Sequence, residues 1–294
     1  MNHIENNSYV HLLRDVYPEL KIQSTQSNEI GQNNDVLIVN DQLIFRFAKY
    51  RDGADRLEEE TTLLERIREY VSLPIPEPIY QHFDAKEPSK TFIGYQMIEG
   101  KPLWKETLNQ LKMDPLQTIA SQLAKFLREL HRIPFREVIP ELPADYVGPY
   151  EEYKDIYERF QEQLFPFMRE DAKKAVSKNF DAFLADESHF QFEPCLIHGD
   201  YGPSNILFDS YENRVSGIID FGGSGIGDPA HDFAGILSGY GESFLNLFAC
   251  EYPGMNGILE RMHFYKSTFA LQEALFGIEN QDKETFQNGI KDYL

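Results

Sequence analysis

Two polar motifs stand close together in the second half of the chain, His198-Gly-Asp-Tyr-Gly-Pro-Ser-Asn205 and Ile218-Ile-Asp-Phe-Gly222. Short apolar blocks surround these two polar motifs. They predict three buried strands, at residues 195–198, 206–208 and 215–219. The aspartate of each motif then stands at the end of a strand. An accidental β-hairpin with acidic residues is the alternative, and the presence of both motifs weighs against it.

The polar side chains of these motifs are those that phosphoryl transfer requires. A γ-phosphoryl group in transfer carries charge on its equatorial oxygens, so the protein contributes positioning and electrostatic stabilisation. Asp200 is suited to accept the proton of a hydroxyl, and Asn205 and Asp220 offer hard oxygen ligands for Mg²⁺. Four residues separate Asp200 from Asn205, as in the H-R-D-x-x-x-x-N motif of protein kinases. The spacing therefore favours Mg²⁺-dependent phosphoryl transfer.

Three motifs together carry a resemblance to a known family. H-G-D-x-x-x-x-N-I-L, I-I-D-F-G and Gly227-Asp228-Pro229-x-x-Asp232 resemble the aminoglycoside phosphotransferase group of the protein-kinase-like fold. The chain is most similar to the 2''-phosphotransferase branch, and the wider group includes choline, homoserine and methylthioribose kinases. Gly199 replaces the arginine through which protein kinases read a phosphorylated activation loop. This departure points away from a protein kinase regulated by phosphorylation.

The resemblance implies an α+β, bilobal protein-kinase-like fold. A small, β-rich lobe at residues 1–98 is expected to bind the nucleotide. A larger, mainly helical lobe at residues 99–294 is expected to carry the catalytic loop and the metal site. Residues 149–190 are charged and aromatic, and in this family such a helical insertion builds one wall of the acceptor site.

The nucleotide lobe has a recognisable hairpin and a weak phosphate loop. Residues 36–39 and 43–48, with a turn between them, predict two paired strands. The polar stretch 27–35 precedes them and is the expected loop over the phosphates. Its single glycine, Gly31, makes it a poor glycine-rich loop by pattern alone.

Arg46 stands where protein kinases have the lysine that grips the α and β phosphates. A guanidinium remains cationic and binds phosphate as a fork, so the replacement is compatible with nucleotide binding. Glu60, on an amphipathic helix predicted at residues 55–70, is the expected partner of Arg46. Lys49 is an alternative cation close to Arg46 in the sequence.

Residues 91–98 predict the strand that leads to the joint between the lobes. By resemblance, a purine base hydrogen-bonds to the backbone between Gln96 and Ile98, and Tyr95 guards the back of the base pocket. A bulky ring at that position goes with a preference for GTP over ATP in the 2''-type enzymes. An ordinary core tyrosine is the alternative. We expect GTP to serve at least as well as ATP.

The carboxyl-terminal part predicts helices at residues 229–250 and 258–278. Asp232 is expected to anchor the loop structurally. Glu242 aligns by resemblance with an acidic acceptor-binding position, and Glu273 is a second candidate. Carboxylates suit a polyamine because charge-assisted hydrogen bonds are strong.

Composition limits the location and the partners. The chain has 294 residues, no secretory signal pattern and no apolar run long enough for a membrane span, so we expect a cytoplasmic protein. Cys195 and Cys250 are its only cysteines, and we expect both to be reduced packing residues. The 28 basic and 48 acidic residues give a net charge of −20, which disfavours nucleic acid and anionic membranes as partners. The excess favours a cationic acceptor, although solubility alone also explains acidic surfaces. We expect a monomer.

These expectations combine into one hypothesis. The γ-phosphoryl group of GTP or ATP passes to a hydroxyl of an aminoglycoside antibiotic, which gives resistance. Asp200 is the base, Asn205 and Asp220 hold Mg²⁺, and Arg46 and Glu60 secure the triphosphate. The alternatives are a metabolic kinase of the same fold that acts on choline, homoserine, a sugar or a macrolide, and a nucleotide-binding module without catalysis.

Overall fold

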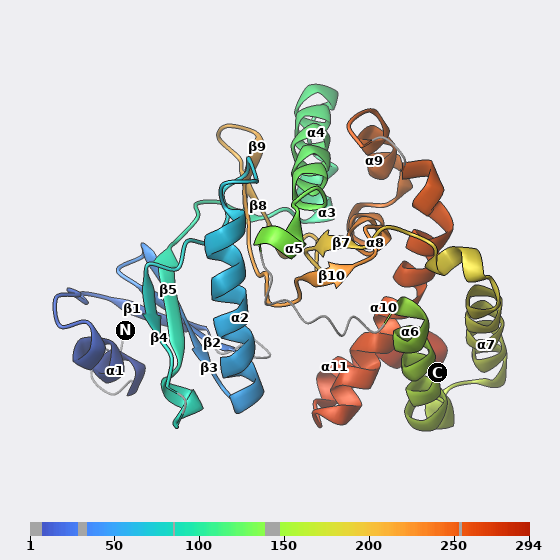
Figure 1. The fold of residues 1–294 in the computed structure, drawn as a ribbon, viewed down its shortest axis with the longest axis horizontal. Coiled ribbons are helices and arrows are strands. Elements are labelled where there is room, and N and C mark those ends of the chain that lie inside the picture. The colour runs from blue at the N-terminus through green and yellow to red at the C-terminus, as the bar shows by residue number, and fades with distance from the viewer. Residues whose placement is uncertain (1–7, 29–33, 85, 139–147, 253–254) are drawn as a thin grey trace. The chain divides into compact units, whose positions relative to one another are not determined.

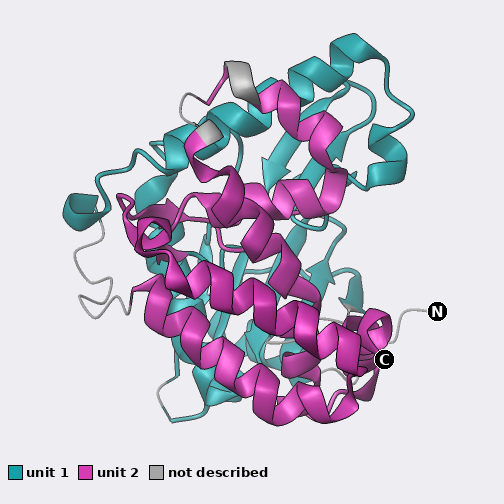
Figure 2. Cartoon of the chain, turned by 90° about the vertical axis from the view of Figure 1, so that its right-hand side faces the viewer, with its two compact units in different colours: residues 1–139, 203–224 teal, residues 140–202, 225–294 magenta. Residues whose placement is uncertain are grey.

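The computed structural model describes residues 8–28, 34–84, 86–138, 148–252 and 255–294. The chain divides into two compact units (Figure 2). Unit 1 comprises residues 1–139 and 203–224, and unit 2 comprises residues 140–202 and 225–294. The division therefore falls inside the His198–Asn205 motif and leaves Asp200 in unit 2 and Asn205 in unit 1. The division into lobes at residues 98 and 99 stays a prediction.

The described part of unit 1 opens with a helix and a five-stranded antiparallel sheet (Figure 1). The elements, with the strands in sheet order, are α1 (Ser8–Val16), β1 (Thr25–Asn28), β2 (Asn34–Val39), β3 (Leu43–Ala48), β5 (Phe92–Gln96) and β4 (Tyr80–His82). The predicted hairpin of β2 and β3 is confirmed, with Ile38 opposite Ile44. Its turn residues Asn40 and Asp41 have φ of 56° and 55°, which these two residue types tolerate. The predicted phosphate loop lies mostly at residues 29–33, outside the described residues.

The side chains of β3 alternate between the two faces of this sheet. Phe45 and Phe47 are fully buried and pack with Phe92 and with Leu13 of α1. Arg46 lies on the opposite face, toward α2 (Arg51–Ile67). The apolar stripe predicted for this helix is confirmed by the burial of Leu57, Leu63, Leu64 and Ile67.

Helices and a second sheet complete unit 1. The helices are α3 (Lys105–Leu108), α4 (Met113–Leu130) and α5 (Phe135–Val138), and the sheet has the order β6 (Lys101–Pro102), β8 (Ile206–Asp209), β9 (Arg214–Ile218). The strands predicted at 206–208 and 215–219 are thus confirmed as an antiparallel pair. Two contacts hold β9 in place, since Ile218 N donates to Pro74 O at 2.9 Å and Val215 N donates to Gln122 Oε1 at 3.0 Å.

Unit 2 is mainly helical. Its elements are α6 (Pro149–Arg159), α7 (Glu170–Ala185), β7 (Cys195–Ile197), β10 (Gly225–Gly227), α8 (Ala230–Tyr240), α9 (Glu242–Leu245), α10 (Leu259–Glu279) and α11 (Lys283–Ile290). A π turn spans Phe160–Leu164, and short 3-10 segments of the chain lie at Pro88–Lys90, Phe165–Phe167, Glu187–Phe190, Asn246–Cys250, Met255–Ile258 and Lys291–Tyr293. The insertion is helical as predicted, and it packs on α10 through stacked rings. The ring centroids of Tyr153 and Tyr265 are 5.0 Å apart, and those of Phe183 and Phe264 are 3.6 Å apart.

The single helix predicted at residues 229–250 is wrong, because the chain turns at Gly241. This glycine has φ of 86°, and its N–H donates to Leu237 O at 3.0 Å, which ends α8. Separate short helical segments follow. No described helix combines the length and the apolar composition that crossing a membrane requires.

Glycine permits the close approach of α10 and α11. A Cβ atom on Gly289 would collide with the backbone oxygen of Ala270 and the backbone nitrogen of Ala274. Gly277 of α10 has the same relation to Phe286 N of α11. The backbones of the two helices therefore touch where these side chains are missing.

We predict that Gly289→Ala lowers the free energy of unfolding by about 1–3 kcal/mol, because overpacking outweighs the gain in helix propensity. Thermal and denaturant unfolding measure the change. Asn288→Ala, at the exposed neighbouring position of α11, is the control and should leave stability unchanged or slightly raised. A Gly289→Ala protein as stable as the control would show that α10 and α11 can move apart with no loss in the free energy of unfolding.

Candidate active site

Arg46 and Glu60 form a buried ion pair within unit 1. The guanidinium Nη1 donates to Glu60 Oε1 at 2.6 Å, and the two side chains are only 11% and 2% exposed. Burial acts to lower the pKa of Arg46, but Glu60, Tyr95 and Asp220 raise it overall, so the guanidinium stays charged. The predicted partner of Arg46 is therefore present. The alternative cation, Lys49, instead lies 3.3 Å from Asp35.

The same ion pair reaches the Asp-Phe-Gly motif. Arg46 Nη2 donates to Asp220 Oδ1 at 3.3 Å, and Phe221 N donates to Glu60 Oε1 at 3.2 Å. The Asp220 side chain is 53% exposed, so its carboxylate remains accessible. Its backbone φ is 65°, a left-handed value that only tight surrounding contacts hold in place. Glu60 and Arg46 provide such contacts.

Asn205 lies beside Asp220 at one end of the β8–β9 hairpin. Ile206 pairs with Ile218, and Ile219 N donates to Asn205 O at 2.9 Å. An amide and a carboxylate are thus adjacent, and both are hard oxygen donors of the kind that Mg²⁺ prefers. The described residues contain no cluster of three or more His, Cys, Asp or Glu side chains that could hold a metal. The donor atoms of this pair would suit Mg²⁺, and the metal-binding role of Asn205 and Asp220 stays a prediction.

The loop of unit 2 that carries Asp200 is held by the buried carboxylate of Asp232. The backbone N–H groups of His198 and Gly199 donate to its two oxygens, each at 2.9 Å. Asp200 N donates to His198 Nδ1 at 3.2 Å. The predicted anchoring role of Asp232 is confirmed, and the Asp200 side chain is exposed at the surface of this unit.

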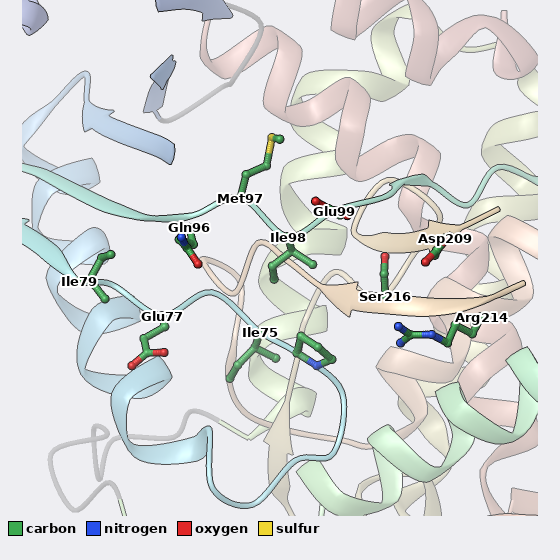
Figure 3. Close-up of a pocket in the computed structure, with 11 residues that line it drawn as sticks. Ile75, Glu77, Ile79, Gln96, Met97, Ile98, Glu99, Asp209, Arg214 and Ser216 are labelled. Carbon is green, nitrogen blue, oxygen red and sulfur yellow. The ribbon is translucent and has the colours of Figure 1, made fainter. Parts of the chain in front are cut away.

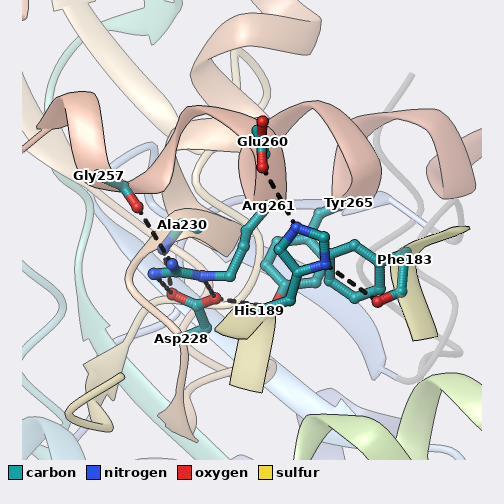
Figure 4. A network of polar contacts seen from close by, with 8 residues as sticks. All are labelled: Phe183, His189, Asp228, Ala230, Gly257, Glu260, Arg261 and Tyr265. Atoms are coloured by element: carbon teal, nitrogen blue, oxygen red, sulfur yellow. Dashed lines mark hydrogen bonds and ion pairs between the residues drawn. The ribbon is translucent and has the colours of Figure 1, made fainter. Parts of the chain in front are cut away.

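A second buried carboxylate, Asp228, was not predicted to have a role (Figure 4). It accepts hydrogen bonds from Arg261 and Tyr265 of α10. The sequence contains a signal for this network, because Arg261, Tyr265 and Thr268 repeat at helical spacing on the buried face of α10. Polar residues at such spacing in an apolar helix indicate a buried polar partner.

The segment predicted to hold the purine lies at the end of β5. Tyr95 is buried and packs with Leu57 and Ile93. Burial raises the pKa of its hydroxyl to about 12, although the charge of Arg46 acts to lower it. Gln96 is exposed and Ile98 is half-buried. The roles of Tyr95, Gln96 and Ile98 in binding a base stay predictions.

A pocket of about 430 Å³ borders this segment (Figure 3). Its walls come from the loop after α2, from the chain between β5 and β6, and from the β8–β9 hairpin. Gln96 and Ile98 line it, whereas Arg46, Glu60 and Asp220 do not. It is therefore separate from the ion-pair cluster of unit 1.

The acceptor candidates Glu242 and Glu273 both lie in unit 2. Glu242 begins α9 and Glu273 lies on α10, and both are exposed. Their part in binding an acceptor stays a prediction. Cys195 is buried, and burial raises the pKa of its thiol, which suits an unreactive packing residue. The side chain of Cys250 lies outside the described residues.

Comparison with known proteins gives consistent matches. Residues 24–265 match the phosphotransferase enzyme family. Viomycin phosphotransferase of Streptomyces vinaceus is 28% identical over 271 residues, which is 90% of each chain. The structure of a type IIIa aminoglycoside 2''-phosphotransferase with GDP and kanamycin superposes with a TM-score of 0.88, at 26% identity and over 96% of both chains. The GDP complex of the wild-type IIIa enzyme gives 0.87 and 26%, over 96% of this chain and 95% of that one.

The predicted α+β, kinase-like fold is confirmed by these structures, since the superposition includes both the sheet region and the helical region. A macrolide 2'-phosphotransferase of type I, at 18% identity, shares the fold with a TM-score of 0.77. The match at residues 24–265 contains the Arg46 cluster, the Asp232-anchored loop and the Asp-Phe-Gly motif. With this match over most of its length, the chain belongs to the phosphotransferase enzyme family.

Proposed function

We propose that this protein transfers the γ-phosphoryl group of GTP or ATP to a hydroxyl of an aminoglycoside. The observation that carries the proposal is the similarity to the GDP and kanamycin complex. That structure superposes with a TM-score of 0.88 over 96% of this chain and is 26% identical in sequence. The Arg46, Glu60 and Asp220 cluster and the anchored Asp200 loop supply the chemical groups that such a reaction uses.

In the proposed reaction, the acceptor oxygen attacks the γ-phosphorus and its proton passes to the Asp200 carboxylate. The bond from phosphorus to the β–γ bridging oxygen breaks, which leaves the nucleoside diphosphate and the phosphorylated acceptor. Asp200 is suited to this role because its backbone is fixed by His198 and its side chain is exposed.

Arg46 is suited to hold the triphosphate because Glu60 fixes and orients a permanently charged fork. Asn205 and Asp220 would hold Mg²⁺ with their side-chain oxygens. When bound, Mg²⁺ would supply positive charge that neutralises the charge developing on the phosphoryl group during transfer. Arg46 Nη2 also neutralises part of the charge of Asp220, which lowers the repulsion between this carboxylate and an approaching triphosphate.

The acceptor class rests on charge as well as on similarity. Exposed carboxylates such as Glu242 and Glu273, in a chain with a net charge of −20, favour a cationic acceptor through charge-assisted hydrogen bonds. Viomycin is the second candidate, because a relative of 28% identity is a viomycin phosphotransferase.

A panel of acceptors tests the function. Purified protein with Mg²⁺ is given GTP or ATP and, separately, aminoglycosides, viomycin, macrolides, choline and homoserine, and phosphorylated products are identified by mass spectrometry. We expect aminoglycosides to be phosphorylated, with kcat/KM for GTP at least equal to that for ATP. Phosphorylation of only a non-aminoglycoside acceptor would replace the proposed substrate, and a strong preference for ATP would remove the role given to Tyr95.

Asp200→Asn tests the base. The substitution removes the proton acceptor and keeps the size and shape of the side chain. We therefore expect kcat to fall on the order of 10²–10⁴-fold while nucleotide affinity stays nearly intact. Steady-state kinetics and nucleotide titration measure the two effects. Asp114→Asn, an exposed aspartate in the first turn of α4, is the control. A variant with full turnover would contradict the role.

Glu60→Gln tests the ion pair. It leaves the buried Arg46 without its closest carboxylate, and loss of a charge-assisted contact of about 1.5–3 kcal/mol predicts a 10- to 100-fold higher KM for the nucleotide. Glu58→Gln, an exposed position two residues earlier on α2, is the matched control. An unchanged KM in Glu60→Gln would show that Arg46 needs no partner to bind phosphate, or does not bind it.

A further inference from the structure

Asp228 is a buried carboxylate with four hydrogen bonds. Arg261 Nε donates to Oδ2 at 2.5 Å and Nη2 donates to Oδ1 at 3.1 Å. The Tyr265 hydroxyl donates to Oδ2 at 2.8 Å, and Ala230 N donates to Oδ1 at 2.9 Å (Figure 4). A buried carboxylate is stable only when its oxygens are paired in this way. Its position is therefore set by the two side chains of α10.

The position of Asp228 in turn sets the start of α8. Asp228 follows directly after β10 and comes two residues before the first residue of the helix, Ala230. Its carboxylate and its carbonyl oxygen accept from the N–H groups of Ala230 and His231. These are backbone groups of the first turn that have no partner within the helix. Arg261 and Tyr265 thus hold the amino-terminal end of α8 through Asp228.

The first turns of α8 also hold the catalytic loop. Asp232 accepts from the N–H groups of His198 and Gly199 at 2.9 Å. One helical turn further, Gly235 packs so closely under the carbonyl oxygen of Tyr201 that a Cβ atom there would collide with it. The helix therefore touches the loop on both sides of Asp200.

Resting on the proposed function, we propose that Arg261 and Tyr265 are positioning residues, which set the place of the Asp200 carboxylate through Asp228 and α8. The chain of contacts lies entirely within unit 2 and contains no exposed link. Arg261 offers a fork to both oxygens of Asp228, whereas lysine would offer a single point charge. A displacement of about 1 Å in a catalytic group lowers the rate about 10²-fold, so small shifts of α8 reach the chemistry.

Tyr265 also contacts the helical insertion at residues 149–190. Its ring stacks on Tyr153 of α6 at 5.0 Å, while its hydroxyl donates to Asp228. Burial and the neighbouring Asp228 raise the pKa of Tyr265, so the hydroxyl remains a donor. One side chain thus joins the helical insertion to the support of the catalytic loop.

Tyr265→Phe and Arg261→Lys test the proposal. Tyr265→Phe keeps the stacked ring and removes one hydrogen bond, and Arg261→Lys keeps the charge and removes the fork. With the acceptor identified by the panel, we expect kcat to fall about tenfold in each variant while KM for the nucleotide changes less than twofold. Gly289→Ala, which weakens α10 at its contact with α11, is the control for destabilisation alone and should keep kcat per folded molecule.

The double variant of Tyr265→Phe with Asp200→Asn separates positioning from a general structural role. A residue that acts through Asp200 loses its effect once that carboxylate is absent, so we expect the double variant to be no slower than Asp200→Asn alone. A further tenfold loss in the double variant would overturn the proposal.

Hydrogen exchange of the free protein gives a test that needs no substrate. We expect the amides of His198 and Gly199 to exchange faster in Tyr265→Phe than in the wild type, with α11 unchanged. Unchanged exchange together with unchanged kcat would overturn the proposal. Faster exchange in a protein that phosphorylates none of the acceptors would instead refute the proposed function and keep the structural link.

Discussion

Buried carboxylates hold Arg46, the Asp-Phe-Gly motif and the loop before Asp200 in place, and Glu60 is the first of these acids. Its Oε1 atom accepts from Arg46 of β3 and from the backbone of Phe221, so one oxygen links α2, the first sheet and the Asp-Phe-Gly motif. A carboxylate that is 2% exposed requires such partners, because an unpaired buried charge is strongly destabilising. The stability of unit 1 and the geometry of the side chains proposed to bind phosphate therefore depend on the same contacts.

In unit 2, two further buried carboxylates, Asp228 and Asp232, are also paired with hydrogen-bond donors. Asp232 accepts hydrogen bonds from the N–H groups of the loop before Asp200, and Asp228 accepts hydrogen bonds from the first turn of α8 and from side chains of α10. Neither acid is placed to accept a proton from substrate, since both are buried and fully engaged in hydrogen bonds. Asp200 differs because its side chain is exposed. Burial thus separates the structural acids from the candidate base in one short stretch of chain.

The sequence predicted the features that depend on local pattern. Two short apolar runs on either side of a turn predicted the β2–β3 hairpin, and helical spacing predicted the buried stripe of α2. The motif spacing, with the family resemblance, predicted the kinase-like fold. The resemblance also identified Glu60 as the partner of Arg46. The break at Gly241 was missed, because apolar residues on both sides of the glycine continue the helical pattern.

Contacts between distant charged groups escaped prediction for a physical reason. Arg261 lies 33 residues from Asp228, and Arg46 lies 174 residues from Asp220, and no periodicity links such positions. Exposed carboxylates such as Glu242 and Glu273 carry no local signal that separates an acceptor ligand from a solvated surface residue. The assignment of Glu242 came from resemblance alone, and Glu273 was a second candidate on a predicted helix.

The left-handed backbone conformation of Asp220 limits which residue types this position tolerates. The residue adopts a φ of 65°, a conformation in which aspartate and asparagine are several-fold enriched over other side chains, and under the proposed function it also supplies an oxygen ligand. Glutamate would keep the charge, but the left-handed conformation would destabilise the protein. Glycine would adopt the conformation easily but would lose the carboxylate. Aspartate thus combines a carboxylate with tolerance of this backbone conformation, and asparagine would keep the conformation but lose the charge.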